Sequence, residues 1–393
     1  MTVPAPNQLA QSANATGMAA LQQGDFAGAE HAFAAATMAD PSAPGLWRNL
    51  AHARRELGDD AGERAALESA LTADRTDFTA WLRLAQLHER LGDVREALLA
   101  WGGVLQMAAG IDPLPPALAP LLSHGRAYCD AQRAQLRAEV DNVLGADLAA
   151  LAPMEQRRVR TFFESATGVR RIYANECAGL HYPFLPADEF FDAHHFPWFA
   201  ELTAATPAIR AELQALMADP GDALRPYVRQ DAGTPANKWT ALDNRLDWGA
   251  VFLWEYGAPN AAVLARCPVT AATLAALPAA HIPARAPNAF FSVLKPRTRI
   301  PPHTGVSNTR AIIHLPLIVP PACGFRVGGE VRQWEEGVPF AFDDTIDHEA
   351  WNDSDELRAV LIFDVWNPHL TPAEQEMIMR YYATSDAAVA SMG

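Results

Sequence analysis

Residues 46–71 read LWRNLAHARRELGDDAGERAALESAL, with an Ala- and Leu-rich run on either side of Gly58-Asp59. Each run spaces its apolar side chains three or four residues apart, which is typical of an amphipathic helix. A glycine between two such runs ends the first helix, because the residue after a helix commonly adopts a left-handed conformation. This segment therefore predicts two helices joined by a tight turn.

The same turn recurs every 34 residues, at Gly24-Asp25, Gly58-Asp59 and Gly92-Asp93. Large apolar residues follow the same period, at Phe33, Leu67 and Trp101. The period and its Trp and Leu-Gly pattern resemble tetratricopeptide repeats over about residues 10–108. Such arrays commonly offer a concave groove to a peptide or partner protein, and the alternative is that three repeats only extend and cap the next domain.

Composition excludes several classes of protein. The chain has 393 residues, half of them hydrophobic, so it is not a disordered chain. Its 31 Lys and Arg against 46 Asp and Glu give a net charge of −15, which disfavours nucleic acid as a partner. Four widely spaced cysteines contain no CxxC pair, so neither a zinc knuckle nor a disulfide framework is expected.

The sequence also bears on location. The first residues, MTVPAP, carry no basic or apolar signal region, and no run of 18 apolar residues occurs. We therefore expect a cytoplasmic protein with no membrane partner.

The rest of the sequence divides into two parts. A Pro- and Gly-rich break at 110–116 opens a helical connector, expected over 110–167 after the repeats of 1–109. From 168 to 393 short β-branched and aromatic runs separated by turns predict a sandwich or barrel. Its candidate strands are 251–254, 289–294, 311–319, 340–342 and 358–366. The expected fold class is α+β and multidomain, with a helical array followed by a β domain.

Arg358 opens one of these strands and shares a face with Val360 and Ile362. A guanidinium that faces a barrel interior keeps its charge and requires an anion. That anion could be Asp364 on the same face or the carboxylate of a ligand. His314 lies in another apolar strand, where a lone histidine is usually a core residue.

Two further histidines change the interpretation. His303 follows 299–302, expected to be a loop, and His348 comes 45 residues later. Two histidines at the ends of different strands, with Arg358 ten residues after the second, fit a non-haem iron oxygenase. There 2-oxoglutarate chelates Fe(II), and its far carboxylate needs a buried cation.

The sequence around these residues resembles that of the aspartyl/asparaginyl β-hydroxylase family. The similarity is dense over about 286–372 and is carried by PPHTGVSNTR (301–310), WEEG (334–337), FDD (342–344), HEAW (348–351) and DVWNP (364–368). It implies a double-stranded β-helix, a jelly-roll fold, and a dioxygenase that uses Fe(II), 2-oxoglutarate and O2. Such enzymes hydroxylate the β-carbon of Asp or Asn in peptides and release succinate and CO2.

The resemblance also assigns residues. His303 and His348 would bind iron, and Arg358, helped by the Ser292 hydroxyl, would pair with the distal carboxylate of 2-oxoglutarate. His314 would lie near the other carboxylate of this cosubstrate.

Trp248 would wall the same pocket. Most related oxygenases add an acidic ligand two residues after the first histidine, where this chain has Gly305. Glycine there is the family's pattern, with a water thought to fill the position. Asp344 and Asp347 are near in sequence and could in principle ligate, although Asp347 should point away from His348.

One position departs from the family, which commonly has Arg where this chain has Ile312. The change puts in doubt how the near carboxylate of the cosubstrate is held, or which acidic substrate is accepted. Arg310 remains on the same face and could receive a substrate carboxylate. Two alternatives stay open: a repeat-containing adaptor with a degenerate β domain, and a hydroxylase of a free amino acid or other small acid.

Overall fold

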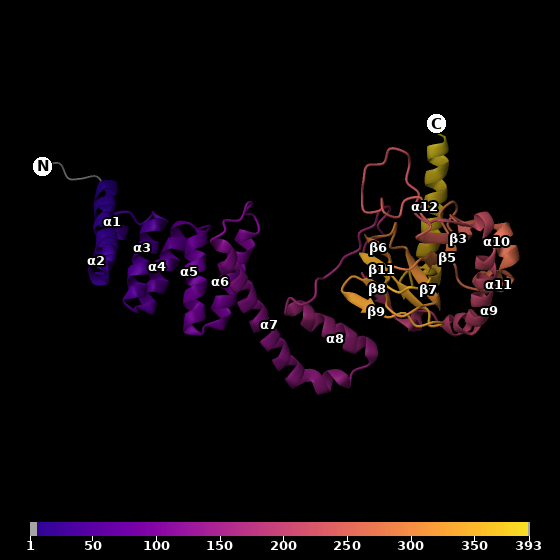
Figure 1. The fold of residues 1–393 in the computed structure, drawn as a ribbon, viewed down its shortest axis with the longest axis horizontal. Coiled ribbons are helices and arrows are strands. Elements are labelled where there is room, and N and C mark those ends of the chain that lie inside the picture. The colour runs from indigo at the N-terminus through magenta and orange to yellow at the C-terminus, as the bar shows by residue number, and fades with distance from the viewer. Residues whose placement is uncertain (1–5, 392–393) are drawn as a thin grey trace. The chain divides into compact units, whose positions relative to one another are not determined.

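The computed structural model describes residues 6–391. The chain divides between residues 151 and 152 into two compact units, the first helical and the second built on antiparallel sheets (Figure 1). The expected fold class, a helical repeat array followed by a β domain, is confirmed. The finer division at 109/110 and 167/168 stays a prediction. None of the helices within residues 6–391 is long and apolar enough to cross a membrane.

The first unit begins with three pairs of antiparallel helices. The paired helices are α1 (Pro6–Gln22), α2 (Phe26–Ala39), α3 (Pro44–Glu56), α4 (Asp60–Ala73), α5 (Phe78–Leu91) and α6 (Val94–Ala108). The long helix α7 (Leu118–Ala149) follows them. The glycines at the recurring turns have left-handed φ angles of 71–76°, as the sequence predicts. Asp25 and Asp59 then begin the next helix, each accepting a hydrogen bond from a backbone N–H of its first turn.

The large residues of the 34-residue period form the core of the array. Phe33, Leu67 and Trp101 are completely buried. Gly125 of α7 lies so close to the Trp101 ring that a side chain there would overlap it. The repeat period thus predicts both the helix pairs and the residues that pack between them.

The described part of the second unit, residues 152–391, contains helices and twelve short strands. The helices are α8 (Pro153–Ala166), α9 (Phe199–Ala218), α10 (Ala261–Arg266), α11 (Pro268–Ala275) and α12 (Pro372–Ala390). The strands are β1 (Phe190–Phe191), β2 (Leu224–Pro226), β3 (Trp248–Glu255), β4 (Ala258–Pro259), β5 (Ala289–Leu294), β6 (Thr298–His303), β7 (Arg310–Ile318), β8 (Cys323–Val327), β9 (Glu330–Arg332), β10 (Phe340–Phe342), β11 (His348–Asn352) and β12 (Arg358–Trp366).

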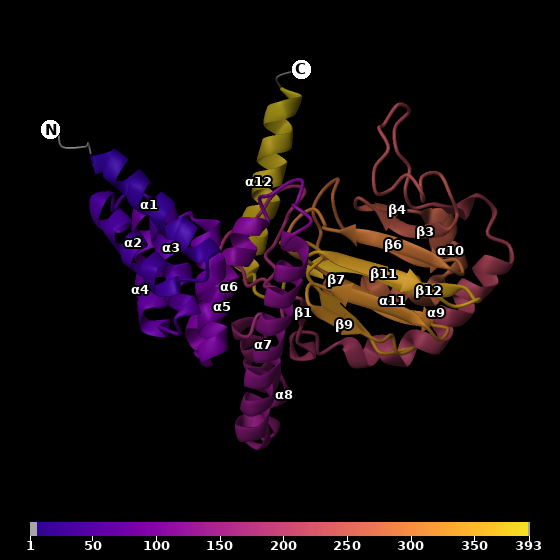
Figure 2. The same ribbon diagram turned by 60° about the vertical axis from the view of Figure 1, so that its left-hand side comes forward.

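These strands form two antiparallel sheets (Figure 2). The larger has the order β1-β10-β7-β12-β5-β3-β2, with β4 beside β3, and the smaller has the order β6-β11-β8-β9. Side chains from both sheets meet in one hydrophobic cluster, including Phe325 of the smaller sheet and Phe342 of the larger. The sheets therefore pack face to face, with part of their shared interior left for a site.

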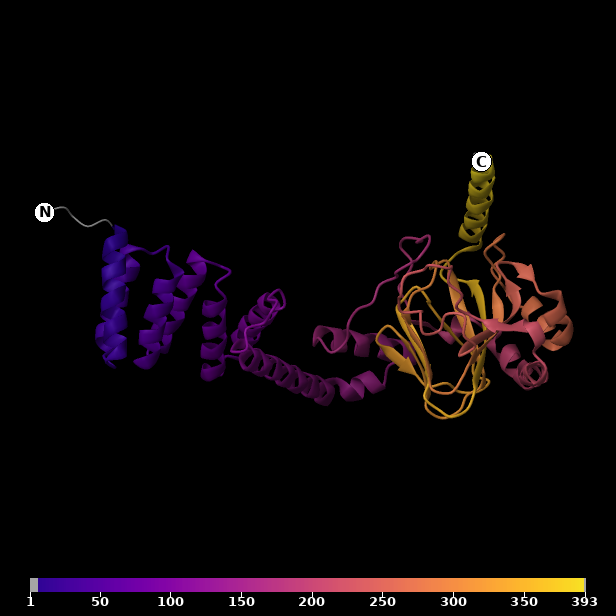
Figure 3. The same ribbon diagram turned by 45° about the horizontal axis from the view of Figure 1, so that its top comes forward.

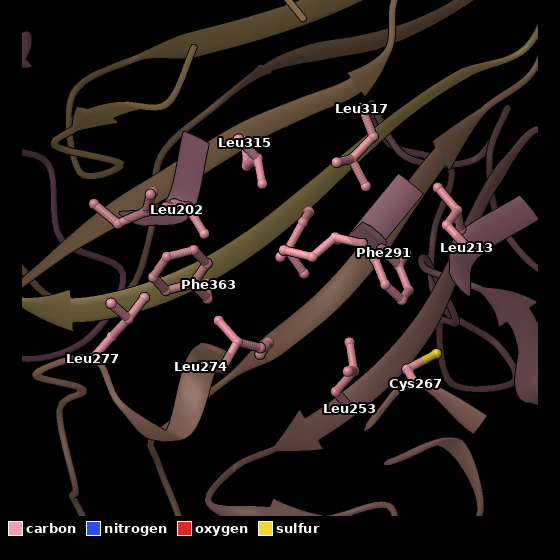
Figure 4. Packing of buried hydrophobic residues seen from close by; sticks show 14 of the residues in the cluster. Leu202, Leu213, Leu253, Cys267, Leu274, Leu277, Phe291, Leu315, Leu317 and Phe363 are labelled. Carbon is pink, nitrogen blue, oxygen red and sulfur yellow. The ribbon is translucent and has the colours of Figure 1, made fainter. Parts of the chain in front are cut away.

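The outer face of the larger sheet is covered by α9, α10 and α11 (Figures 3 and 4). Leu213 of α9 and Leu274 of α11 pack there with Phe291 of β5 and Phe363 of β12. Because side chains alternate along a strand, the odd-numbered residues of β12 face these helices. Its even-numbered residues, Arg358 among them, face the space between the sheets.

The smaller sheet was not predicted, and one expectation about it is wrong. Residues 299–302, expected to be a loop, belong to β6. Pro301 and Pro302 lack the N–H that a central strand needs, but β6 is an edge strand, where proline is tolerated. Without a β-branched run, neither β6 nor its neighbour β11 carries a recognisable strand pattern.

Candidate active site

A cavity of about 850 Å³ lies between the two sheets. It is lined by every residue for which the sequence predicts a role: Trp248, Ser292, His303, Arg310, His314, His348 and Arg358. These residues come from β3, β5, β6, β7, β11 and β12. The fold therefore brings together side chains that are up to 110 positions apart in the sequence.

His303 and His348 lie opposite each other on β6 and β11, with their ring centroids 4.1 Å apart. The Nδ1 of His303 is 2.8 Å from the carbonyl oxygen of Pro301, and that of His348 is 3.0 Å from the carbonyl of Ile346. A carbonyl only accepts, so each Nδ1 carries the proton and donates it. The Nε2 of each ring is then the nitrogen with a free lone pair, as in histidines that bind metals.

Burial lowers the pKa of His303, and burial together with the neighbouring His303 lowers that of His348 well below its usual value. Both rings are therefore neutral at neutral pH, the form that binds a metal ion. No third candidate ligand joins the pair: within residues 6–391 no group of three or more His, Cys, Asp or Glu side chains is placed to hold an ion.

The carboxylate of Asp344 occupies the space in front of Gly305, where a side chain would overlap it. The Gly305 N–H donates to the Asp344 carbonyl oxygen at 2.6 Å, which fixes the two loops together. Burial raises the pKa of Asp344 to about 7. Asp347 instead forms an ion pair with Arg326, so it turns away from the site as expected.

Arg358 is 1% exposed, and its Nε and Nη1 have no hydrogen-bond partner among the described residues. Burial lowers its pKa to about 10, which still leaves the guanidinium charged at neutral pH. Asp364, the internal carboxylate considered as its partner, is bound to Arg310 and Asn288 instead. A buried, charged and unpaired guanidinium that lines a cavity has the chemistry to bind an anion.

Polar groups of three neighbours complete this end of the cavity. Trp248 Nε1 donates to Ser292 Oγ at 3.1 Å, a bond that leaves the Ser292 hydroxyl proton free. Burial, and then the charge of Arg358, lowers the pKa of His314 well below its usual value, and the Nδ1 of this ring has no partner among residues 6–391. Trp334 stacks on His314, with its ring centroid 4.8 Å from the Arg358 guanidinium carbon.

The other side of the cavity is aromatic. Tyr227 stacks on Trp248 with ring centroids 3.9 Å apart, and Trp239 meets His303 edge to face at 5.0 Å. We did not predict a role for Tyr227, Trp239 or Trp334. Trp334 belongs to the WEEG motif, but no strand pattern marks Tyr227, which directly follows the short strand β2, or Trp239, which lies in a turn.

Arg310 lines the cavity but is not free. It forms an ion pair with Asp364, whose oxygens also accept from the backbone and side-chain N–H groups of Asn288, at 2.9 Å each. Ile312, in place of the family's Arg, packs beside the core of the shared interior. This part of the wall therefore has no unpaired cation.

Known proteins are similar to both units of the chain. A family model described as aspartyl/asparaginyl beta-hydroxylase matches residues 203–368, and a tetratricopeptide repeat model matches 14–78. The chain is 34% identical over 229 residues to the ornithine lipid ester-linked acyl 2-hydroxylase of Rhizobium tropici, over 57% of this chain and 75% of that protein.

It is also 36% identical over 138 residues to the aspartyl/asparaginyl beta-hydroxylase of Mus musculus, over 35% of this chain but only 18% of the mouse protein. Among solved structures, the first TPR of Spaghetti (RPAP3) bound to the HSP90 peptide SRMEEVD is similar at 21% identity and a TM-score of 0.28. That match covers 32% of this chain and 97% of the other.

Proposed function

Because the chain belongs to the aspartyl/asparaginyl β-hydroxylase family, we propose that it is an Fe(II)- and 2-oxoglutarate-dependent hydroxylase. The overall reaction converts a C–H bond, O2 and 2-oxoglutarate into C–OH, succinate and CO2. When bound, the iron and the cosubstrate supply the oxidising chemistry, and the protein supplies binding, orientation and exclusion of water.

Arg358 is the observation that carries this proposal. Leaving a buried guanidinium without a partner is costly, and a dicarboxylate such as 2-oxoglutarate would remove that cost. One carboxylate would pair with Arg358 and accept a hydrogen bond from the Ser292 hydroxyl. The neutral His314 would donate to the bound molecule from the same end of the cavity.

His303 and His348 would hold the iron through their Nε2 atoms, with their rings fixed by the two backbone carbonyls. Asp344 would supply negative charge next to the position that Gly305 leaves without a ligand. A divalent cation nearby would favour the charged form of this carboxylate. Trp248, Tyr227 and Trp239 would limit the access of water to this position.

A peptide is the first candidate substrate. The mouse relative is named for Asp and Asn β-hydroxylation, and a tetratricopeptide array is a common binder of peptides and proteins. In this form of the proposal, the repeats recruit a protein substrate and the cavity receives its Asp or Asn side chain.

The acyl chain of a lipid is the second candidate. Arg310 is already paired with Asp364, and Ile312 adds no charge, so an acidic side chain would find no free cation on this wall. The Rhizobium tropici relative is named for hydroxylation of an acyl chain, and it is matched over 75% of its length.

Anaerobic absorbance tests the cofactor site. Adding Fe(II) and then 2-oxoglutarate to the purified apoprotein should produce a visible metal-to-ligand charge-transfer band. The band should be lost in His348→Ala and weakened in Arg358→Ala. A folded protein without the band would contradict the proposal and favour an adaptor, which should bind its partner equally well with both histidines replaced.

A further inference from the structure

The cavity between the two sheets, which holds His303 and His348, is called the catalytic cavity below. A second cavity of about 530 Å³ adjoins it and runs between α12 and residues 180–182. We call it the α12 groove. It is lined by Leu180, His181, Tyr182, Thr309, Ala373, Glu374, Met377, Ile378, Tyr381 and Tyr382. Leu180, Thr309, Tyr381 and Tyr382 line both cavities, so the groove continues from the catalytic site along the helix.

The walls of this groove are mostly hydrocarbon and aromatic. Three of its large apolar residues are exposed: Leu180 by 49%, Met377 by 59% and Tyr381 by 55%. Apolar side chains grouped in a cavity next to a catalytic site are typical of a surface that a ligand covers.

Two polar side chains of the groove, Tyr182 and Glu374, bind each other. Tyr182 Oη donates to Glu374 at 3.1 Å, and Glu374 also accepts from the backbone N–H and hydroxyl of Thr371 at 2.7 and 2.8 Å. The Tyr182 backbone is bonded on both sides to the Asn308 side chain. Neither the Tyr182 hydroxyl nor the Glu374 carboxylate is therefore free for a polar ligand.

Charge at the junction of the two cavities is also neutralised. Among residues 6–391, three arginines line the catalytic cavity. Arg310 is paired with Asp364, and Arg285 binds both oxygens of Asp386 at 2.7 and 2.8 Å. Arg358 is the one that our proposed function assigns to 2-oxoglutarate. A substrate that enters along the groove therefore meets no unpaired positive charge before it reaches the histidines.

We propose that the α12 groove binds the hydrocarbon chain of an acyl-bearing substrate whose reacting carbon lies at His303 and His348. This inference rests on the proposed function and selects its second candidate substrate. The two helical turns from Tyr381 to Ala373 give the groove a length of about 12 Å. Each methylene that enters it should raise the affinity up to about fourfold, until the groove is full.

Calorimetric titration with neutral monoacylglycerols tests this. The probes are octanoyl, decanoyl and dodecanoyl glycerol, each kept below its micelle concentration and added to the full chain. Affinity should rise with chain length, and the heat capacity change should be negative because apolar surface is buried. Equal affinity for the three probes, or no binding, would overturn the inference.

Two exposed alanines of α12 give a matched pair of variants. Ala373 lines the groove and Ala383 does not. Ala373→Trp should lower the affinity for dodecanoyl glycerol at least tenfold, whereas Ala383→Trp should leave it unchanged. If Ala373→Trp fails to fold, Met377→Glu, another exposed groove position, should have the same effect. Unchanged binding in the groove variant would contradict the proposal.

Two further results distinguish a failure of the groove proposal from a failure of the proposed function. An Asp-containing peptide that loses affinity in Ala373→Trp, with no binding of monoacylglycerols, would assign the groove to a peptide and overturn the acyl proposal. The charge-transfer band with Fe(II) and 2-oxoglutarate reports on the proposed function alone. It should be the same in both Trp variants, and its absence from the unmodified protein would contradict the proposed function whatever the groove binds.

Discussion

His303 and His348 occupy the same register position of neighbouring antiparallel strands, and each is held by the carbonyl oxygen two residues before it. The two rings are thus positioned by identical local geometry on two different strands. Because each ring has its own backbone partner, we expect that either can be replaced without disturbing the strand that carries the other.

His303→Ala and His348→Ala should therefore each abolish iron binding, because one remaining imidazole is a poor site for the metal. The fold should be retained. Equilibrium dialysis against Fe(II) under anaerobic conditions, followed by metal analysis, measures the stoichiometry. His31→Ala, at an exposed position of the repeat array, is the control and should bind as much iron as the unmodified protein. Full iron content or full activity in His303→Ala would refute the assignment.

Arg358→Met should leave the apoprotein as stable as before, or make it more stable, because the variant no longer buries an unpaired charge. It should also lose its response to 2-oxoglutarate. In the unmodified protein a concentration of one hundred times Kd should add about 2.7 kcal/mol to the free energy of unfolding.

Differential scanning calorimetry with and without 2-oxoglutarate measures both effects. Arg297→Met, which removes an exposed arginine paired with Asp355, should keep the response. An apoprotein that unfolds when Arg358 is replaced would mean that the arginine serves the fold, and would argue against an anion site.

Gly305→Ala should lower the free energy of unfolding by about 1–3 kcal/mol, since the new methyl group would overlap the carboxylate of Asp344. Asp344→Ala in the same chain should remove the overlap. The double variant should therefore be more stable than the sum of the two single effects predicts, by about 0.5–3 kcal/mol. Urea denaturation of the four proteins gives this coupling, and strictly additive effects would show that the two residues do not contact each other.

Arg310→Met should destabilise the protein by about 3–5 kcal/mol, because it leaves the 2%-exposed carboxylate of Asp364 buried without its cation. Arg285→Met, which breaks the half-exposed pair with Asp386, should cost less than about 1 kcal/mol. Urea denaturation compares them. If Arg310 can be removed at no cost to stability, it is free to bind a substrate carboxylate, and the case for a peptide substrate would be strengthened.

The central strands of the larger sheet could be predicted from the sequence because they bury both faces, whereas the short strands β1, β2 and β4 of the same sheet could not. β12 packs helices on one face and the cavity core on the other, so it reads as a continuous apolar run in which Arg358 stands out. Its bounds, 358–366, agree with the prediction. β6 lies at an edge and carries two prolines, so no local pattern marks it as a strand.

The candidate site could likewise be predicted from the sequence only in part. Motif spacing led to His303, His348 and Arg358, because each of these stands in a motif or a strand. The pairing of Arg310 with Asp364 joins residues 54 positions apart, and the position of Asp344 in front of Gly305 depends on how two loops meet. Such contacts are set by the packing of distant segments, which one sequence does not reveal.

The Gly-Asp pair at each turn also affects how the repeat array can become longer or shorter. The glycine completes one helix and the aspartate begins the next, so residues 25–58 start with Asp25 and end with Gly58. A second copy of this segment inserted after Gly58 would recreate the same dipeptide at both of its ends. The array can therefore gain or lose length by whole 34-residue modules, with the same Gly-Asp pair at every junction, while the second unit stays unchanged.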